Sequence, residues 1–469
     1  MNVLFLLNNI GKWFTEDTLD LANHFASQGD HVCFAIEHNI VEKNFEQEIP
    51  FPKYYFSEYD EINPSCLEAF ENVNLSKIIY PCFNRIVMME HKDRYAKIKD
   101  ADSIIKRLLS FFFYVFEKEN IDVVIYENIS NSYAYAAFFT ALHFGKAFAG
   151  NSCSRIPGRA EICFDPYGEI ERRDQYFQSL QISDLSTDEL QSYTEYIRNI
   201  NKLKPDYMKN NPTSMNVNYT KFFLDRIGGV FKAIKYSQKW DEKSYQNPSP
   251  FHLVKYTTKR ILARKKRLKK LRRMFDAIPE NGNYFIYPMH YQPESSTSVN
   301  AMFYDNQVEV IKNIAFSLPL GYKLLVKDHP NGIGFLPMED YEAIKKIPGV
   351  LYVSPLEDNK RLINNSRGII TLTSTMGYEA LLMDKPVVTV GKVFYNFHPF
   401  CFHAEGYNEI FDCIQQALHC DTSKFQEYNL LFTKTNYDFS YERGTDFPKS
   451  FRDALIERIA TREGTERYD

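Results

Sequence analysis

Short apolar runs alternate with segments of helical spacing over the first 150 residues. Four runs have the length and composition of buried strands: Val3–Leu7, His31–Ile36, Asp122–Tyr126 and Ala147–Asn151. Two segments between them repeat apolar positions at helical spacing: Thr18–Gln28 and Ser132–Phe144. Strands joined by helical crossovers form a parallel sheet that helices cover on both faces. The pattern therefore predicts a Rossmann-like domain over residues 1–170.

The same alternation returns from Tyr284 onward. Five apolar runs predict strands: Tyr284–Tyr287, Lys323–Val326, Val350–Val353, Gly368–Leu372 and Pro386–Val390. Five helices are expected near Gln307–Leu318, Asp340–Ile347, Glu357–Asn365, Gly377–Met383 and Asn408–Leu418. We expect a second doubly wound domain over residues 281–425. Ligands of such sheets bind at the carboxyl ends of the strands, so two such domains that face each other would form a ligand cleft.

The segment between these domains and the end of the chain have a different pattern. Residues 171–280 are polar, with long helical spacings at Asp188–Asn201 and Val217–Tyr236, and we interpret them as a helical insertion and basic linker. Residues 426–469 are expected to form a helical tail that packs back on the N-terminal domain. The predicted class is α/β, with two Rossmann-like domains and a helical insertion.

Composition narrows the functional classes. The chain has 469 residues, of which 44% are hydrophobic and 25% charged, as in soluble globular proteins. No run approaches the roughly 18–20 apolar residues of a membrane span, and no basic region precedes the first apolar run, so we expect no signal peptide. The eight cysteines have no metal-binding spacing, which fits a cytoplasmic protein without a metal site. The net charge of −4 argues against nucleic acid as the partner.

The segment from Lys255 to Arg273 departs from this average, because eleven of its nineteen residues are Lys or Arg and none is acidic. Apolar residues recur in and after it at helical spacing: Ile261, Leu268, Leu271 and Phe275. Such a helix could lie on anionic lipid, where each cation contributes about 1 kcal/mol. The lysines expected at the lipid are Lys265, Lys266, Lys269 and Lys270. Nucleic-acid contact and a solvated linker helix are the alternatives.

Two sequences at predicted strand ends could bind phosphate, although no glycine-rich phosphate loop is present. In Lys327-Asp328-His329-Pro330 the proline ends the strand, which leaves an ammonium and an imidazole at the carboxyl edge of the sheet. The alternative for this sequence is a surface turn with solvated charges. The loop from Pro288 to Thr297 also follows a strand, and we place His290 and Glu294 in the cleft.

A third sequence combines hydroxyls with a glycine where a helix is expected to begin. It contains Thr373, Ser374, Thr375 and Gly377. Free N–H groups at a helix N-terminus bind phosphate, and a glycine permits close approach. The alternative is simple N-capping, which needs one hydroxyl. Glu379 lies one turn further on, where it could hydrogen-bond a ribose or support the loop.

Together these segments resemble a known family. YPMHYQPESST, VKDHP and ITLTSTMGYEALLMDKPVVTVGKVFY are similar to the nucleotide-binding half of the bacterial capsule polysaccharide synthesis family. That family includes cytoplasmic GT-B glycosyltransferases that transfer 3-deoxy-manno-octulosonic acid (Kdo) from CMP-Kdo. The His-Pro and Ser/Thr elements also resemble those that hold the CMP phosphate in bacterial GT-B sialyltransferases. The resemblance covers residues 284–400. It implies that His329, Ser374 and Thr375 bind the nucleotide of a CMP-sugar and that no metal or other cofactor is needed.

The N-terminal half offers two carboxylates for the chemistry. Glu127 ends the strand before a helix and is the expected base or nucleophile, as an acidic residue of the first domain is in the related sialyltransferases. Its alternative role is a helix cap. Asp165, in an Asp-Pro-Tyr-Gly sequence that is also an ordinary turn, is the competing candidate. Arg155 and Arg159 could bind a sugar carboxylate through bidentate pairs.

These observations favour a metal-independent GT-B glycosyltransferase of bacterial capsule or lipopolysaccharide synthesis, with a glycan or lipid-linked glycan acceptor. The expected donor is a CMP-activated ulosonic acid, Kdo or a relative. Lys327, His329, the hydroxyls and the helix dipole would then offset charge on the departing phosphate. A transferase that uses a UDP-sugar, a GDP-sugar or a polyol phosphate is one alternative. A non-catalytic export or scaffold protein is another.

Overall fold

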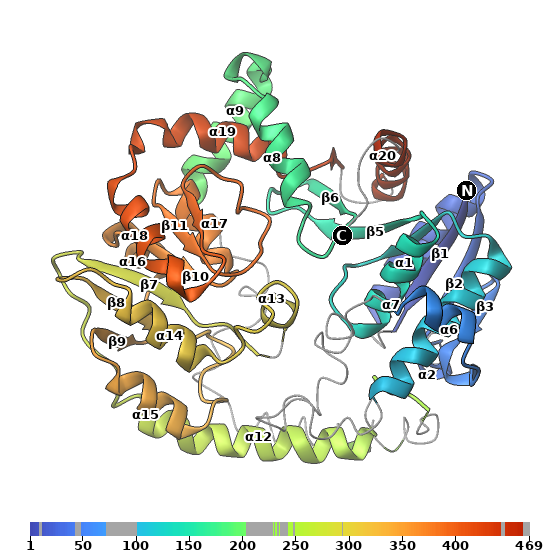
Figure 1. Ribbon diagram of the computed structural model, residues 1–469, viewed down its shortest axis with the longest axis horizontal. Helices are drawn as coiled ribbons and strands as arrows, with labels where there is room; N and C mark the ends of the chain where they lie inside the picture. The colour runs from blue at the N-terminus through green and yellow to red at the C-terminus, as the bar shows by residue number, and fades with distance from the viewer. Residues whose placement is uncertain are drawn as a thin grey trace. The chain divides into compact units, whose positions relative to one another are not determined.

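The computed structural model describes residues 1–8, 12–42, 48–71, 101–202, 243–246, 249–292, 294–441 and 446–462, with isolated positions between 228 and 234 (Figure 1). The helix expected over Val217–Tyr236 falls almost wholly outside the described residues. The chain forms two compact units. Unit 1 contains Met1–Glu169, Lys232–Leu253 and Asn436–Asp469, and unit 2 contains Ile170–Phe231 and Val254–Thr435.

Unit 1 is built on a seven-stranded sheet with the order β13-β6-β5-β4-β1-β2-β3. Its strands are β1 (Asn2–Leu7), β2 (His31–Ile36), β3 (Lys53–Tyr55), β4 (Val123–Tyr126), β5 (Ala147–Cys153), β6 (Arg159–Cys163) and β13 (Phe439–Ser440). The five strands from β3 to β5 run parallel, and β6 and β13 add an antiparallel edge. The strand order reverses between β1 and β4, where Asn8 and Glu127 follow the two strand ends.

The described part of unit 1 also contains helices. They are α1 (Lys12–Ser27), α2 (Asn39–Glu42), α3 (Pro64–Ala69), α6 (Ala101–Glu119), α7 (Ser132–His143) and α20 (Phe447–Arg462). The side chain of Asn131 caps α7 by accepting a hydrogen bond from the backbone N–H of Ala134. Most of α7 is buried, and it packs against α6, whereas α20 packs against α1.

Unit 2 contains a six-stranded parallel sheet with the order β12-β11-β10-β7-β8-β9. Its strands are β7 (Tyr284–Pro288), β8 (Lys323–Lys327), β9 (Val350–Val353), β10 (Gly368–Thr371), β11 (Val387–Thr389) and β12 (Cys401–His403). Relative to the chain, this is the 3-2-1-4-5-6 order of the Rossmann fold. The order reverses between β7 and β10, so this pair marks where a ligand of unit 2 is expected to bind.

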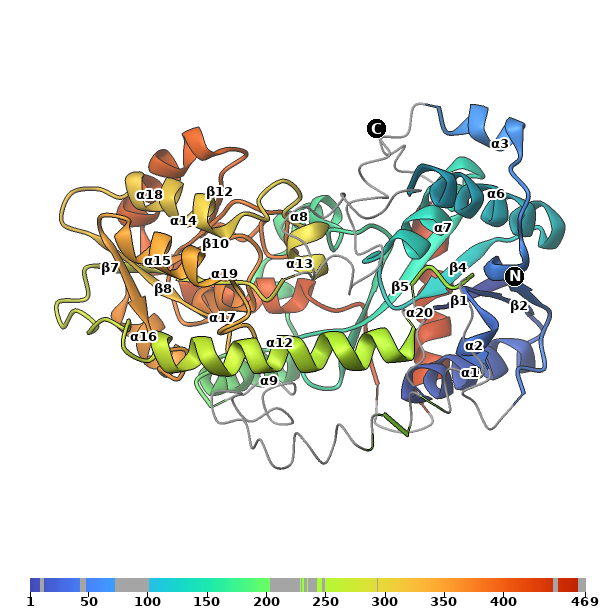
Figure 2. The ribbon, with the colours of Figure 1, turned by 90° about the horizontal axis from the view of Figure 1, so that it is seen from below.

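Among the described residues of unit 2, ten α-helices are present: α8 (Ile170–Ser179), α9 (Thr187–Asn199), α12 (Pro250–Leu271), α13 (Ser295–Ser298), α14 (Gln307–Phe316), α15 (Met338–Lys346), α16 (Asn359–Asn365), α17 (Thr375–Leu382), α18 (Ile410–His419) and α19 (Phe425–Thr435). Helices α8 and α9 pack against α19. Figure 2 shows α12 along its whole length, and its first four residues are assigned to unit 1. Leu268 and Leu271 of α12 enter the core of unit 2.

The two doubly wound sheets confirm the predicted α/β class with two Rossmann-like domains. Each strand predicted from an apolar run is present with ends that differ by two residues at most. The first crossing between the units follows Glu169, next to the expected domain end at residue 170. The last crossing follows Thr435, so α19 belongs to unit 2 and α20 belongs to unit 1.

Candidate functional site

The reversal of strand order in unit 2 brings three loops to one edge of the sheet. They follow β7, β8 and β10, and the register pairs Pro288 with Lys327 at the ends of the first two strands. These loops carry His290, His329 and Ser374, which were predicted from their positions directly after strands. The structure therefore places the three predicted phosphate-binding sequences at the expected ligand edge.

His290 is held as a neutral imidazole. Its backbone N–H donates to Gln307 Oε1 at 2.6 Å, and Gln307 Nε2 donates back to the His290 carbonyl at 2.9 Å. Its Nε2 accepts a long hydrogen bond of 3.4 Å from the backbone N–H of Thr373, which joins the loops after β7 and β10. Burial lowers the pKa of His290 to about 3. The buried Gln307, which fixes this loop, was not predicted from the sequence.

His329 is also neutral, and its hydrogen bonding sets its tautomer. Nδ1 accepts a hydrogen bond from the backbone N–H of Asn331 at 3.1 Å, so the ring proton is on Nε2. Burial, with a smaller effect from the charge of Lys327, lowers the pKa of His329 to about 4. At neutral pH His329 would therefore act at a phosphate as an uncharged hydrogen-bond donor.

The ammonium of Lys327 does not lie where it was expected, at the open edge of the sheet. Its Nζ donates to the carbonyl of Pro355 at 2.9 Å, and the residue is only 3% exposed. Burial lowers the pKa of this ammonium to about 8. The ammonium thus satisfies a carbonyl beyond the end of β9 and does not lie open to a ligand.

A buried carboxylate anchors the loop that carries His329. Asp328 Oδ2 accepts hydrogen bonds from the Tyr341 hydroxyl at 3.0 Å and the Tyr352 hydroxyl at 3.1 Å. Burial raises the pKa of Asp328 to about 6, although both hydrogen bonds oppose the shift. The Tyr341 hydroxyl also accepts from the backbone N–H of Gly334, which ties the loop to α15.

One face of the basic helix α12 braces the same loop. Arg264 Nε donates to the Ile333 carbonyl at 2.7 Å, and Arg267 Nη1 donates to the carbonyls of Gly334 and Phe335. The Arg260 guanidinium stacks on the Phe335 ring at 3.7 Å. These arginines are therefore part of the site's scaffold.

The apolar residues of α12 do not form the lipid contact that was expected of them. Leu268 and Leu271 are buried in the core of unit 2, where Phe275 packs against them. The structure thus corrects the interpretation of this stripe as a membrane-facing surface. The lysines Lys265, Lys266, Lys269 and Lys270 do lie exposed on the outer side of the helix.

The hydroxyl residues at the start of α17 have distinct positions. Ser374 is the N-cap, and its side chain accepts a hydrogen bond from the backbone N–H of Met376 at 3.2 Å. Thr373 Oγ1 donates to the Ser296 carbonyl at 2.7 Å. Thr375 is half-buried, and its hydroxyl has no hydrogen-bond partner among the described residues. Of the three, Thr375 is therefore the side chain that is open to a ligand.

Gly377 is needed for packing. A Cβ at this position would lie within 3.0 Å of the Tyr395 hydroxyl and of its ring carbon Cζ. That hydroxyl donates to the carbonyl of Ser374 at 2.7 Å. The glycine therefore admits Tyr395, which fixes the beginning of α17, and close approach of a phosphate is not required to explain it.

The two predicted carboxylates of this edge have different surroundings. Glu379 forms an ion pair of 2.9 Å with Lys360 of α16, and both side chains are less than 15% exposed. This pair supports the predicted structural role of Glu379. Glu294 is exposed at the start of α13, where its carbonyl accepts hydrogen bonds from the hydroxyls of Thr297 and Ser298.

In unit 1, Glu127 lies beside the reversal between β1 and β4. It is exposed, and its carboxylate has no hydrogen bond or ion pair among the described residues. The surrounding protein still raises the pKa of Glu127 through partial desolvation. An available carboxylate at a strand end is the arrangement expected of a base or nucleophile.

Polar residues that were not predicted lie at the ends of β1, β2 and β4, the last of which precedes Glu127. The Tyr126 hydroxyl donates to Asn8 Oδ1, and Asn8 Nδ2 donates to Gln246 Oε1 at 2.8 Å. The fully buried Glu37 at the end of β2 accepts hydrogen bonds from the Ser244 hydroxyl and the Tyr245 N–H, both at 3.0 Å. These contacts join distant parts of the chain, so sequence spacing gave no signal for them.

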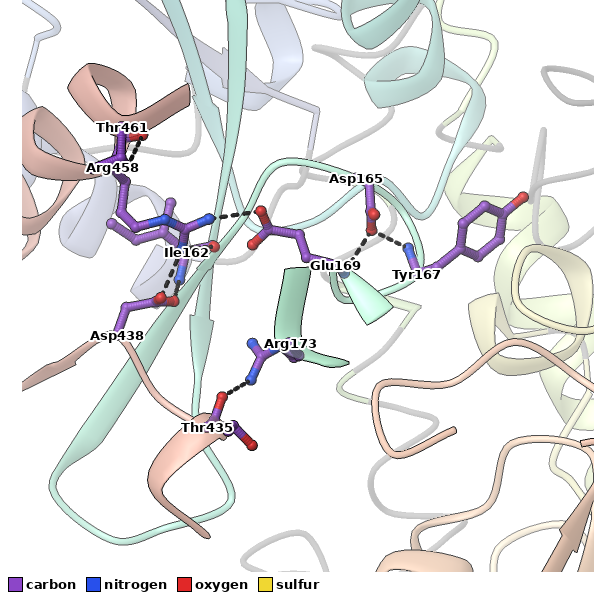
Figure 3. Close-up of polar contacts among 9 residues, drawn as sticks. All are labelled: Ile162, Asp165, Tyr167, Glu169, Arg173, Thr435, Asp438, Arg458 and Thr461. Atoms are coloured by element: carbon purple, nitrogen blue, oxygen red, sulfur yellow. Dashed lines mark hydrogen bonds and ion pairs between the residues drawn. The ribbon is translucent and has the colours of Figure 1, made fainter. Parts of the chain in front are cut away.

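Asp165 has a structural role (Figure 3). Its Oδ1 accepts hydrogen bonds from the backbone N–H groups of Tyr167 at 2.7 Å and Glu169 at 2.9 Å, which closes the predicted turn. Arg458 then pairs with Glu169 at 2.6 Å and with Asp438 at 2.7 Å. These contacts fix the chain where it leaves unit 1, and they favour the turn interpretation of Asp165 over the catalytic one.

The two arginines predicted to bind a sugar carboxylate lie in the turn between β5 and β6 and at the start of β6. Arg155 is exposed in this turn. Arg159 begins β6, where its guanidinium stacks on the Tyr437 ring at 4.6 Å.

Comparison with known proteins shows which family part of the chain resembles. Residues 226–403 match the sequence model of a family described as "Capsule polysaccharide biosynthesis protein". The matched segment is similar to that family. This segment extends through β12 and contains the loops after β7, β8 and β10. The resemblance recognised in the sequence is therefore confirmed over the part of the chain that holds the candidate nucleotide site.

Solved structures whose similarity extends beyond the matched segment have low sequence identity and low TM-scores. UDP-GlcNAc 2-epimerase from Methanocaldococcus jannaschii has 12% identity and a TM-score of 0.26, with 98% of this chain and 99% of that chain covered. Thermosulfurimonas dismutans KpsC, β-Kdo 2,7 transferase, has 12% identity and a TM-score of 0.36, with 76% and 90% covered. The fold assignment rests on the strand orders. No curated protein matches the sequence.

The described ranges contain neither a membrane-spanning helix nor a metal-binding group of side chains. None of the helices there combines the length and apolar content needed to cross a membrane. No group of three or more His, Cys, Asp or Glu side chains there is arranged to hold a metal ion.

Proposed function

We propose that this protein is a glycosyltransferase of bacterial surface polysaccharide synthesis that uses a CMP-activated ulosonic acid. The observation that carries the proposal is the neutral His329 on the loop after β8, beside the strand reversal where the Thr375 hydroxyl and the N-terminus of α17 lie. Nε2–H of His329, the hydroxyl and the helix N–H groups are all donors, which suits an anionic phosphate. The capsule-synthesis match over this segment supports the same assignment.

The proposed reaction divides the work between the units. In unit 2, donors around the phosphate stabilise the negative charge that develops as CMP departs. In unit 1, Glu127 either takes the proton of the acceptor hydroxyl or attacks the anomeric carbon. Neither role requires a cofactor or metal. A UDP-sugar, GDP-sugar or polyol phosphate donor is the alternative on the same fold, and a polymer-binding scaffold is the non-catalytic one.

The acceptor and the site of action are further parts of the proposal. A glycan, carried on a lipid, would bring the protein to the inner face of the cytoplasmic membrane as a peripheral enzyme. The exposed lysines of α12 support contact with anionic lipid. The thiols of Cys33, Cys66, Cys401, Cys413 and Cys420 form no disulfide, which fits a reducing compartment.

Calorimetric titration with CMP, UDP and GDP tests the assignment. We expect CMP alone to bind, and we expect His329→Ala to weaken this binding about tenfold, because one hydrogen bond to a charged group contributes about 1.5–3 kcal/mol. His329→Gln, which can present an N–H donor at a similar reach, should restore part of the affinity. Preferred binding of UDP or GDP would move the donor to the alternative class. Absence of nucleotide binding would favour the scaffold.

A pair of variants separates ligand binding from helix capping at α17. Thr375→Val keeps the shape of the side chain and removes its hydroxyl, so CMP affinity should fall about tenfold with little change in stability. Ser374→Ala removes the N-cap, so it should lower the free energy of unfolding by about 1 kcal/mol. Calorimetry and chemical denaturation measure the two effects. If CMP affinity is unchanged in Thr375→Val, the loop after β10 is only a helix cap.

A further inference from the structure

A basic groove lies between α12 and α15 in unit 2, and the proposed transfer reaction does not use it. Its volume is about 580 Å³, within the usual range of ligand sites. Cationic side chains line it: Lys266, Arg267, Lys269 and Lys270 come from α12, and Arg273 follows just after its end. Ala263 and Met338 add apolar surface. The groove is thus a cationic hollow with an apolar part.

The cations of the groove are only partly neutralised. Lys270 forms an ion pair with Glu342, and Glu339 is the one carboxylate in the lining. Lys266, Lys269 and Arg273 are exposed and have no ion pair or hydrogen bond among the described residues. Three positive charges without an ion pair therefore surround the hollow, and Glu339 is the one carboxylate of its lining.

The spacing of these charges costs helix stability. Lys266 and Lys269 are three residues apart in α12, so they lie on one face of the helix, and Arg273 follows two residues after its end. Like charges at these spacings repel one another. A bound anion would reverse this repulsion, so charge complementarity indicates an anionic ligand.

A neighbouring apolar side chain indicates the source of that anion. Leu262 precedes Lys266 by one turn on the same face and is 45% exposed. A soluble phosphate would give this leucine no apolar partner, whereas a lipid surface offers acyl chains beside phosphate groups. Together, the hollow, the three cations and the leucine fit a phospholipid headgroup.

We propose that the groove between α12 and α15 binds the phosphate headgroup of an anionic phospholipid, with Leu262 at the level of the acyl chains. This proposal rests on the membrane contact proposed above and gives it a defined site. Recognition then depends on the position of each cation and on the hollow, as well as on the total charge of the helix.

Binding to vesicles of phosphatidylcholine with and without phosphatidylglycerol tests this proposal. The double variant Lys266→Gln/Lys269→Gln should weaken binding to the anionic vesicles by about tenfold or more, since each cation near the surface contributes about fivefold. Lys255→Gln/Lys259→Gln is the matched control, because it removes two exposed lysines of the same helix that lie outside the groove. We expect the control to change binding less than threefold.

A further variant tests the hollow without changing the charge. Ala263→Phe fills part of the groove and should also weaken vesicle binding, and thermal unfolding verifies that it folds. Equal losses in both lysine variants, with none in Ala263→Phe, would overturn the groove while leaving a diffuse membrane contact. Saturable binding of glycerol phosphate without vesicle binding would overturn the lipid as the source. Because CMP titration is independent of vesicles, failure of the transferase proposal would be seen separately.

Discussion

Turnover should fall by about 10²–10⁴-fold in Glu127→Gln, the range usually lost with a general base. Glutamine keeps the shape of the side chain but can neither accept the proton of an acceptor hydroxyl nor form a glycosyl ester. CMP affinity should hardly change, because the proposed nucleotide site is in unit 2. The raised pKa of Glu127 also predicts that wild-type turnover decreases on acidification already above the ordinary glutamate range, as the carboxylate becomes protonated. Initial rates across pH, together with CMP calorimetry, measure these effects.

Asp165→Asn is the matched control. Asparagine can still accept the two backbone hydrogen bonds that Asp165 Oδ1 receives, so the turn and the rate should both be preserved. Normal turnover in Glu127→Gln with a collapse in Asp165→Asn would transfer the catalytic role to Asp165. Collapse of both would indicate two catalytic carboxylates, as in a retaining transferase. Normal rates in both would exclude this mechanism.

Asp328→Asn should remove a pH-dependent change of about 3 kcal/mol from the free energy of unfolding. The folded-state pKa of Asp328, about 6, is roughly two units above the ordinary aspartate value. A raised pKa means that the folded state holds this proton more tightly than the unfolded state. Wild-type stability from this group is therefore fully present below about pH 4 and is lost as the pH rises to about 6. Asparagine has no such proton. The free energy of unfolding of the variant should therefore rise relative to that of wild type as the pH increases from about 4 to about 6.

Chemical denaturation at a series of pH values measures this difference. Tyr352→Phe offers a second reading, because its hydroxyl donates to Asp328 Oδ2 and thereby lowers the pKa of this carboxyl. Its removal should extend the loss of stability to higher pH. Parallel pH profiles for wild type and Asp328→Asn would show that this carboxyl does not titrate in the window.

Local sequence was sufficient for most of the strands and for the sheet edge at which the loops of the proposed nucleotide site lie. Continuous apolar runs such as Tyr284–Tyr287 and Val350–Val353 identify strands buried on both faces. His290, His329 and Ser374 directly follow such strands, so parallel packing brings their loops to one edge. The strand β13 could not be predicted in this way, because its two residues are defined by pairing with β6.

The roles that were corrected depend on contacts between distant residues. Nothing near Lys327 in the sequence shows that its ammonium will donate a hydrogen bond to the carbonyl of Pro355. Likewise, Gly377 is explained only by Tyr395. The spacing of Leu268 on the basic helix fits a lipid surface and a protein core equally well, and the fold selects the core. Periodicity gives the face of a helix, but not what covers that face.

The return of the chain from unit 2 to unit 1 affects how the protein folds during synthesis. Asp438, which accepts a hydrogen bond from the backbone N–H of Ile162, is 276 residues further along the chain. Since β13 and α20 complete unit 1, the first sheet to leave the ribosome is the last to be closed. Unit 2 can form before then, because β7 to β12 are contiguous in sequence. The edge of β6 meanwhile stays unpaired, which is where chaperone binding or misassembly of a nascent chain would concentrate.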